Sequence, residues 1–382
     1  VWIGQFLSRL GSGMTAFALG VYVYRAGGGA AAYSMVLLAA FLPPVLIAPL
    51  GGVVADRFDR LRVMWIGDLA SAVGIVVTAM IVRNGYAAGP TLYVAVAVTA
   101  ICSGFHGPAF KAAVSEMVEP RDYGRAAGMV QLAEAARYVF APLVASLLMS
   151  RFSVHIVLIG DATTFVLAAA VVVVVASPRP RRGDEKERAA PALYELLEAL
   201  RSLRENPTIL RLLMVTTVVT FSTGVFQALF GPFVLSQASA GTFGRIQSIA
   251  ATGMVASSVV VAGFGGARDR RHILRLSLVG LGVFFIGIAV SPGPIMITVS
   301  AFLLFSTLPI TNTSLEVLFR HAVHGRYEAR MWAIVSFVTQ IGLLVGLGTA
   351  GFAADHLNRF VGGGQGPDLS AAIIIIAAGV VV

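Results

Sequence analysis

Five ionisable side chains fall inside stretches of sequence that are otherwise apolar. Arg9, Asp68, Glu134, Arg137 and Asp161 each lie in an apolar run long enough to cross a bilayer. A charge in hydrocarbon costs several kcal/mol, so such residues usually face the interior of a helix bundle and mark paths for ions, protons or substrates. The chemistry that these side chains could perform is proton exchange on the carboxylates, with the arginines as partners.

Each acid allows two interpretations. A desolvated carboxyl group takes up a proton more readily, whereas a nearby arginine opposes this, so a partner that comes and goes could couple protonation to transport. The alternative is a fixed ion pair that holds helices together. We favour the ion pair for Asp68, near the predicted cytoplasmic surface, and leave both readings open for Asp161. Glu134 and Arg137, three residues apart on one helical face, are the preferred coupling pair. Arg9 is expected to contact an anionic substrate or to neutralise one of these acids.

The composition requires a lipid environment for these residues. Of the 382 residues, 57% are hydrophobic and 12% are charged, whereas soluble domains carry roughly 25% charged residues. The single cysteine, Cys102, excludes a disulfide within the chain. The net charge of +9 comes from basic residues between apolar segments and not along one face, so no nucleic-acid partner is expected.

Apolar stretches of spanning length recur along the chain and predict about twelve transmembrane helices, in an all-α membrane protein. Glycine- and proline-rich breaks separate them at 27–29, 84–90, 291–294 and 362–368. The last stretch is shorter than the twenty or so residues that a spanning helix needs, so we expect both chain ends to be trimmed. The predicted helices are roughly 1–24, 32–54, 63–83, 91–111, 126–149, 154–176, 208–235, 243–265, 273–290, 295–315, 330–354 and 369–382.

Most of the 28 lysines and arginines fall on one side of this arrangement. Because basic residues concentrate in cytoplasmic loops, both termini are predicted to be cytoplasmic. Arginine greatly outnumbers lysine, and alanine, valine and glycine abound, which suggests a high-GC bacterial genome. The expected location is therefore the bacterial inner (plasma) membrane.

The longest break divides the chain into two halves. Residues 177–206 begin with the charge run SPRPRRGDEKER and continue with leucines at helical spacing, which predicts a cytoplasmic linker with an amphipathic surface helix. We therefore expect six-helix bundles at 1–176 and 207–382. The two halves also share a sequence pattern, since Gly52 precedes Asp56 and Gly265 precedes Asp269 by the same spacing. Paired halves of this kind are typical of transporters with the substrate site between them.

The segment Gly52-x-x-x-Asp56-Arg57-x-x-Arg60 resembles the signature loop of the major facilitator superfamily. Over its whole length the chain is similar to the branch that holds macrolide-efflux and enterobactin-exporter proteins, in segments such as VWIGQFLSRLGSGM, GFHGPAFKAAVSEMV and GDATTFVLAA. Asp59 stands where the superfamily usually has glycine, and an acid there is typical of this branch. The resemblance implies two pseudo-symmetric six-helix bundles that rock between inward- and outward-open states.

In that family the signature loop acts as a latch between the bundles, although a loop that only sets topology would also fit. The latch residues that the resemblance implies are Gly52, Asp56, Arg57, Asp59, Arg60, Gly265, Asp269 and Arg270. A segment of the predicted fifth helix resembles a degenerate antiporter motif, with other small residues in place of its glycines. Its residues are Ala141, Pro142, Ala145 and Ser146.

In this fold the first, fourth, seventh and tenth helices line a central cavity. Phenylalanines on the seventh and tenth helices would suit a large apolar substrate, although each could instead face lipid. The cavity candidates are Gln5, Arg9, His106, Phe226, Gln227, Phe230, Phe305 and Asn312.

The function expected from these features is proton-coupled efflux of amphipathic drugs or secondary metabolites, macrolide- or siderophore-like, by alternating access. The expected partners are a small amphipathic substrate, protons and the lipid bilayer, and the expected state is a monomer. No Walker loop, metal cluster or nucleophile motif occurs, so no enzyme, cofactor or metal site is expected. The alternatives are an importer or lysolipid flippase of the same fold, or a membrane-embedded receptor or enzyme.

The orientation can be tested by labelling. A cysteine placed within residues 55–62 should be protected from a membrane-impermeant thiol reagent in intact cells and should react after permeabilisation, because this loop is predicted to be cytoplasmic. Labelling of that cysteine from outside intact cells would overturn the predicted topology.

Overall fold

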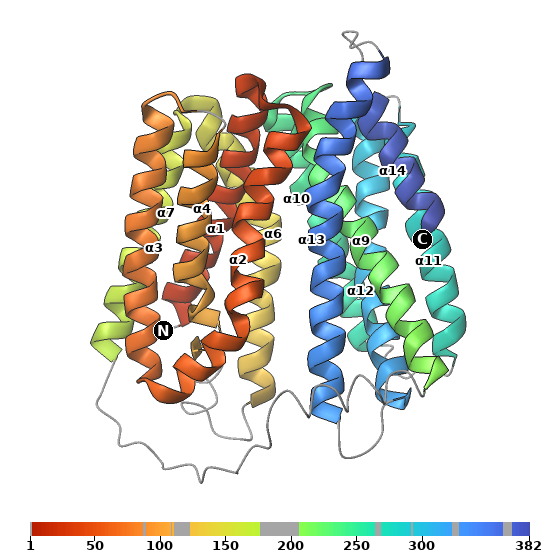
Figure 1. The fold of residues 1–382 in the computed structure, drawn as a ribbon, viewed down its shortest axis with the longest axis horizontal. Coiled ribbons are helices and arrows are strands. Elements are labelled where there is room, and N and C mark those ends of the chain that lie inside the picture. The colour runs from red at the N-terminus through yellow and green to blue at the C-terminus, as the bar shows by residue number, and fades with distance from the viewer. Residues whose placement is uncertain are drawn as a thin grey trace.

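The computed structural model describes residues 2–86, 89–107, 109–110, 123–175, 206–263, 269–291, 293–322, 328–361 and 369–382. Twelve α-helices are found in this part of the chain, in two groups that stand side by side (Figure 1). The first bundle contains α1 (Trp2–Val23), α2 (Gly29–Arg57), α3 (Arg60–Arg83), α4 (Pro90–Gly104), α6 (Tyr123–Arg151) and α7 (Val154–Val175). The second bundle contains α9 (Pro207–Leu235), α10 (Ala240–Gly263), α11 (Arg270–Ala289), α12 (Pro294–Ala322), α13 (Glu328–Val361) and α14 (Leu369–Val381).

The helices contact one another in the same pattern in both bundles. In the first bundle α1 packs on α6 and α7, α3 packs on α4 and α7, and α2 packs on α4. In the second, α9 packs on α13 and α14, α11 packs on α12 and α14, and α10 packs on α12. Helix α1 thus corresponds to α9, α2 to α10, α3 to α11, α4 to α12, α6 to α13 and α7 to α14. Between the bundles, α2 contacts α13 and α6 contacts α10, and the same correspondence converts the first of these contacts into the second. The two halves are therefore pseudo-symmetric, as predicted.

The outer faces of the helices are apolar. Seven helical segments among the described residues are long and apolar enough to cross a membrane, and the first, Gly4–Ala48, runs through both α1 and α2. The helices α4 and α14 are apolar but shorter. Large aliphatic side chains such as Val174 and Ile295 are more than four-fifths exposed, which suits contact with lipid and not with water.

Most predicted helix boundaries are correct to within a few residues, and three differ. The helix α4 ends at Gly104 and not near 111, because a turn at Phe105 interrupts it before helical backbone resumes. The helices α12 and α13 continue to Ala322 and Val361 through polar residues that the hydropathy criterion had placed outside the membrane. The predicted linker at 177–206 and its amphipathic helix lie outside the described residues, apart from Asn206.

The chain reverses between α1 and α2 without a long loop. The π-helical turn η1 (Tyr24–Gly28) connects them, where the sequence predicted a glycine-rich break at 27–29. Gly27 has φ 86° and Gly29 has φ 67°, values that glycine adopts without the steric penalty of a Cβ atom. This tight reversal presents the first turn of α2 toward α13. We call this side of the molecule the η1 end.

The two bundles pack closely at the η1 end. The rings of Phe17 in α1 and Phe243 in α10 stack with their centroids 5.1 Å apart. A Cβ atom on Gly231 of α9 would overlap the ring of Tyr33 in α2. Such contacts through glycine let helices approach closely in a membrane, where packing and not hydrophobic exclusion drives association.

Glycines also join α9 to α13 within the second bundle. A Cβ atom on Gly346 of α13 would overlap the backbone carbonyl oxygen of Phe221 in α9, and one on Gly224 of α9 would overlap the carbonyl oxygen of Leu343. Each helix therefore uses a glycine to admit the backbone of the other.

Replacing Gly346 with alanine should force α9 and α13 apart and lower the free energy of unfolding by about 1–3 kcal/mol, the typical cost of overpacking. The thermal midpoint of the detergent-purified protein measures this effect. Gly280→Ala in α11 is the matched control, because its Cβ atom would meet only ordinary contacts at 3.5 Å and beyond and alanine favours the helix. Equal midpoints for the two variants would contradict the proposed close approach.

Candidate functional site

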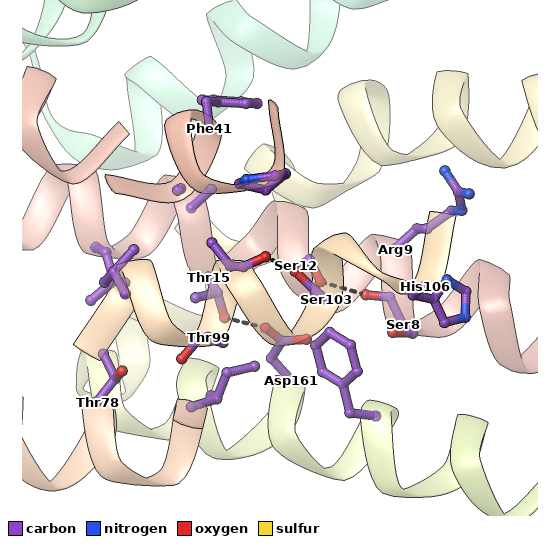
Figure 2. Close-up of a pocket in the computed structure, with 18 of the residues that line it drawn as sticks. Ser8, Arg9, Ser12, Thr15, Phe41, Thr78, Thr99, Ser103, His106 and Asp161 are labelled. Carbon is purple, nitrogen blue, oxygen red and sulfur yellow. Dashed lines mark hydrogen bonds between the residues drawn. The ribbon is translucent and has the colours of Figure 1, made fainter. Parts of the chain in front are cut away.

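A cavity of about 370 Å³ lies within the first bundle. On one side it is lined by a polar face of α1, where Gln5, Ser8, Ser12 and Thr15 recur every three or four residues, the spacing that places side chains on one face of a helix. Figure 2 shows Ser8, Ser12 and Thr15 along this face, with Asp161 of α7 close to Thr15. Thr78, Thr99 and Ser103 contribute further hydroxyl groups. We call this the polar cavity.

Asp161 is held in the polar cavity by hydroxyl groups. Its carboxylate is buried, with 1% of the residue exposed. The Thr15 hydroxyl donates a hydrogen bond of 2.6 Å to Oδ2, and the Thr164 hydroxyl donates one of 3.3 Å to Oδ1. A Cβ atom on Gly11 of α1 would overlap Oδ1 of Asp161, so glycine at this position lets α1 pass directly over the carboxylate.

Asp68 of α3 occupies another part of the same cavity. It is as deeply buried as Asp161. Gln5 of α1 donates to its Oδ2 at 3.5 Å, and Nε2 of His106 lies 3.7 Å from its Oδ1. The His106 ring stacks on Phe110, with centroids 5.9 Å apart, and its buried Nε2 makes no hydrogen bond within the described residues. Among the described residues, the basic side chain that lies beside Asp68 is therefore a histidine.

Glu134 of α6 contacts two arginines. Its Oε2 lies 3.8 Å from Nη1 of Arg137, the spacing within α6 that the sequence suggested, and its Oε1 pairs with Nη1 of Arg9 from α1. The guanidinium of Arg9 also lies 5.8 Å from the ring centre of Phe110, within the range of a cation–π contact. Arg9 thus pairs with an acid, which is one of its two expected roles, and it also lines the polar cavity.

A second cavity, of about 290 Å³, lies between the bundles. The rings of Phe226 and Phe230 in α9 stack at 4.6 Å, and Phe305 of α12 meets Phe226 edge-on at 6.1 Å. Gln227 is a polar group among these rings. We call this the aromatic cavity. It shares Phe41, Arg137, Ala16 and Leu37 with the polar cavity, so the two adjoin.

Seven of the eight cavity candidates line one of these two cavities. Asn312 does not, since its side chain is exposed on α12 and it contributes to neither lining. The hydroxyl groups of α1 were not among the predicted cavity residues, although the three- and four-residue spacing of Gln5, Ser8, Ser12 and Thr15 could have indicated them. Phe17, Tyr33 and Phe243, which line the aromatic cavity, were not predicted either, because contacts between bundles leave no periodic pattern.

The latch segment is partly described. Gly52, Asp56 and Arg57 lie in the last turns of α2, but the side chains of Asp56 and Arg57 are outside the described part of the structure, as is all of Gly265. Asp59 caps α3 by accepting from the backbone N–H of Arg62 at 3.0 Å, and Asp269 caps α11 by accepting from that of His272 at 3.1 Å.

These caps correct the predicted correspondence between the halves. Asp269 matches Asp59 and not Asp56, because each is the acid that precedes the first residue of its helix, Arg60 in α3 and Arg270 in α11. Spacing from a glycine did not reveal this, since the position of a helix start depends on the capping group.

The antiporter-like segment lies where α6 passes between α1 and α10. Ala141, Ala145 and Ser146 are buried. A Cβ atom on Gly13 of α1 would lie 2.8 Å from Cβ of Ala141, and one on Gly244 of α10 would overlap the side chain of Ser146 and approach the carbonyl oxygen of Pro142. Pro142 and Ser146 therefore meet the second bundle at the η1 end, whereas Ala141 packs against α1 within the first bundle.

The described residues contain no group of three histidine, cysteine, aspartate or glutamate side chains placed to hold a metal ion. The chemistry that the site offers is proton exchange on buried carboxylates beside a cavity that can hold an apolar molecule.

Comparison with known proteins decides the family. The model of the Major Facilitator Superfamily matches residues 1–346. The chain belongs to the major facilitator superfamily.

Similar proteins include macrolide efflux proteins, as the sequence segments indicated. Macrolide efflux protein A of Streptococcus pyogenes is 26% identical over 367 residues, which cover 94% of this chain and 89% of that protein. The protein of the same name from Enterococcus faecalis is 26% identical over 329 residues, covering 84% of this chain and 100% of that protein. The crystal structure of the nucleoside transporter NupG superposes with a TM-score of 0.77 at 14% identity, covering 100% of this chain and 95% of that one. As a member of the major facilitator superfamily, the 382-residue chain itself is a multi-pass membrane transporter.

The Thr15 hydroxyl group, which donates to Asp161, can be removed by a substitution that keeps the shape of the side chain. Thr15→Val should lower the free energy of unfolding by about 1–3 kcal/mol, because a buried carboxylate loses a hydrogen-bond donor. The thermal midpoint in detergent measures the loss. Thr99→Val is the matched control, since its hydroxyl lines the same cavity but donates to the carbonyl oxygen of Ala95 in its own helix. A loss of the same size in both variants would contradict a specific role for the Thr15 hydroxyl.

Proposed function

We propose that this transporter exports small amphipathic molecules across the bacterial plasma membrane in exchange for protons. The observation that carries the proposal is that the polar cavity, with its buried acids, adjoins the aromatic cavity between the bundles. An amphipathic molecule can place its apolar part among Phe226, Phe230 and Phe305, while Gln227 and the shared Arg137 contact its polar groups.

The packing at the η1 end supports alternating access. Contacts between the bundles at Phe17, Tyr33, Gly231 and Gly244 all lie in the half of the molecule toward η1. If both termini are cytoplasmic, this half is the outer one, and the structure is an inward-facing state. Rocking about the central cavity would then break these contacts and expose the aromatic cavity to the outside.

Asp161 is the acid that we propose to carry the proton. Glu134 already has two cationic partners, Arg9 and Arg137. The hydrogen-bond partners of Asp161 among the described residues are neutral hydroxyl groups. The carboxylate of Asp161 can therefore take up a proton. This differs from the preference for Glu134 that the sequence suggested. We assign Glu134 to holding α1 against α6, and Asp68 with His106 to a second protonation site in the polar cavity.

The direction of transport is proposed from the relatives. Two proteins of similar length named for macrolide efflux favour export over the alternatives of import or lysolipid flipping. We keep the latch function for the loop from Gly52 to Arg60 and its counterpart from Gly265 to Arg270, and an antiporter role for the segment from Ala141 to Ser146. We also keep the bundles at 1–176 and 207–382, with 177–206 as a cytoplasmic linker, and a monomer as the working unit.

A transport assay tests the proposal. Cells that express the protein should accumulate less of a fluorescent amphipathic compound or a macrolide than cells with an empty vector, and a protonophore should abolish the difference. A panel of such compounds would define the substrate. Accumulation that does not fall, or that falls equally with the proton gradient collapsed, would rule out proton-driven export.

Substitution of the acids identifies the coupling group. Asp161→Asn should reduce proton-driven efflux at least tenfold while substrate still binds, because the amide keeps the shape but cannot take up a proton. Glu134→Gln should mainly reduce thermal stability, since it removes the anion that pairs with both Arg9 and Arg137. Efflux that survives in Asp161→Asn and is lost in a stably folded Glu134→Gln would return the coupling role to Glu134.

A further inference from the structure

A carboxylate of the second bundle caps a helix of the first. Asp355 lies near the end of α13, and its Oδ1 and Oδ2 accept hydrogen bonds of 3.0 Å from the backbone N–H groups of Ala30 and Ala31. These amides belong to the first turn of α2, where N–H groups have no partner within their own helix. The carboxylate also lies at the positive end of the α2 dipole, which stabilises a negative charge.

The backbone around this contact is shaped for it. Gly29, the first residue of α2, has φ 67°, and a Cβ atom on it would lie 2.9 Å from Oδ2 of Asp355. One turn earlier in α13, a Cβ atom on Gly351 would overlap the Ser34 hydroxyl and the carbonyl oxygen of Ala30. The helices α2 and α13 therefore run together at the η1 end, side by side at the centre of the molecule (Figure 1).

An N-cap normally comes from the residue just before its helix. Gly28, at the N-cap position of α2, offers no side chain that could accept a hydrogen bond. The cap of α2 is instead more than three hundred residues away in the sequence, on the opposite bundle. It can therefore exist only while the bundles are closed at this end, and a motion that separates α2 from α13 must break both hydrogen bonds together.

We propose that Asp355 is a positioning residue of the transport cycle, a clasp that favours closure of the η1 end by capping α2 from across the bundle interface. This inference goes beyond the substrate and proton sites, and it rests on the alternating-access function proposed above. Loss of a two-amide cap should change the ratio of closed to open molecules by roughly two- to thirtyfold, the equivalent of a typical helix cap.

Spin-label distance measurements on the full-length chain test the clasp. Labels at Ala26→Cys, in η1, and Asn358→Cys, on α13, report the separation of the two bundles in a Cys102→Ser background, since both positions are exposed and Cys102 is the single cysteine. In Asp355→Ala the population with long distances should grow by the factor given above. Asp355→Asn, which keeps one acceptor oxygen and the original volume, should shift the population less and remains informative if the alanine variant fails to fold.

Asn206→Ala is the matched control. Asn206 caps α9 by accepting from the backbone N–H groups of Thr208 and Ile209, so this variant also loses a two-amide cap, but one that lies within a single bundle. It should leave the distance distribution unchanged. Unchanged distances in both Asp355 variants, or an equal shift in Asn206→Ala, would overturn the clasp.

The outcome is separable from that of the proposed function. If the wild-type protein moves no substrate but the Asp355 variants show more of the open state, the clasp is supported and export is refuted. Proton-driven efflux by the wild type together with unchanged distances would retain export and refute the clasp.

Discussion

Every acid described in the interior of the first bundle has a partner on α1, and the arrangement of the site depends on this. Gln5 contacts Asp68 of α3, Arg9 pairs with Glu134 of α6, and Thr15 donates to Asp161 of α7. In hydrocarbon an unpartnered charge is too costly to keep, so α1 must stay in register with three other helices at once. A shift of α1 along its axis would disturb all three contacts together.

The fold could be predicted from the sequence to a large extent because few backbone arrangements are stable in lipid. A chain in hydrocarbon must satisfy its backbone within helices, and the twelve predicted helices follow from that constraint alone. The exceptions are features that the hydropathy of the sequence does not predict. The turn η1 depends on two glycine conformations, and α12 and α13 continue through polar residues because a helix needs no apolar side chains once it leaves the hydrocarbon.

The site was predictable in its residue types but not in its contacts. Buried charges identified Arg9, Asp68, Glu134, Arg137 and Asp161, and all of them line the polar cavity or contact a residue that does. Their partners could not be deduced, because pairing between helices depends on packing that a single sequence does not encode locally. The contact of Asp355 with the backbone N–H groups of α2 is such a case.

The buried acids and the cluster of phenylalanine rings belong to different halves of the chain. The buried acids and the hydroxyl groups belong to the first bundle, whereas the clustered rings of Phe226, Phe230, Phe285 and Phe305 belong to the second. Side chains on α9 and α12 can therefore change in size or shape without disturbing the carboxylates and their partners. If the buried acids carry protons as proposed, a lineage that kept its first half and varied its second could acquire new cargo while retaining its proton coupling.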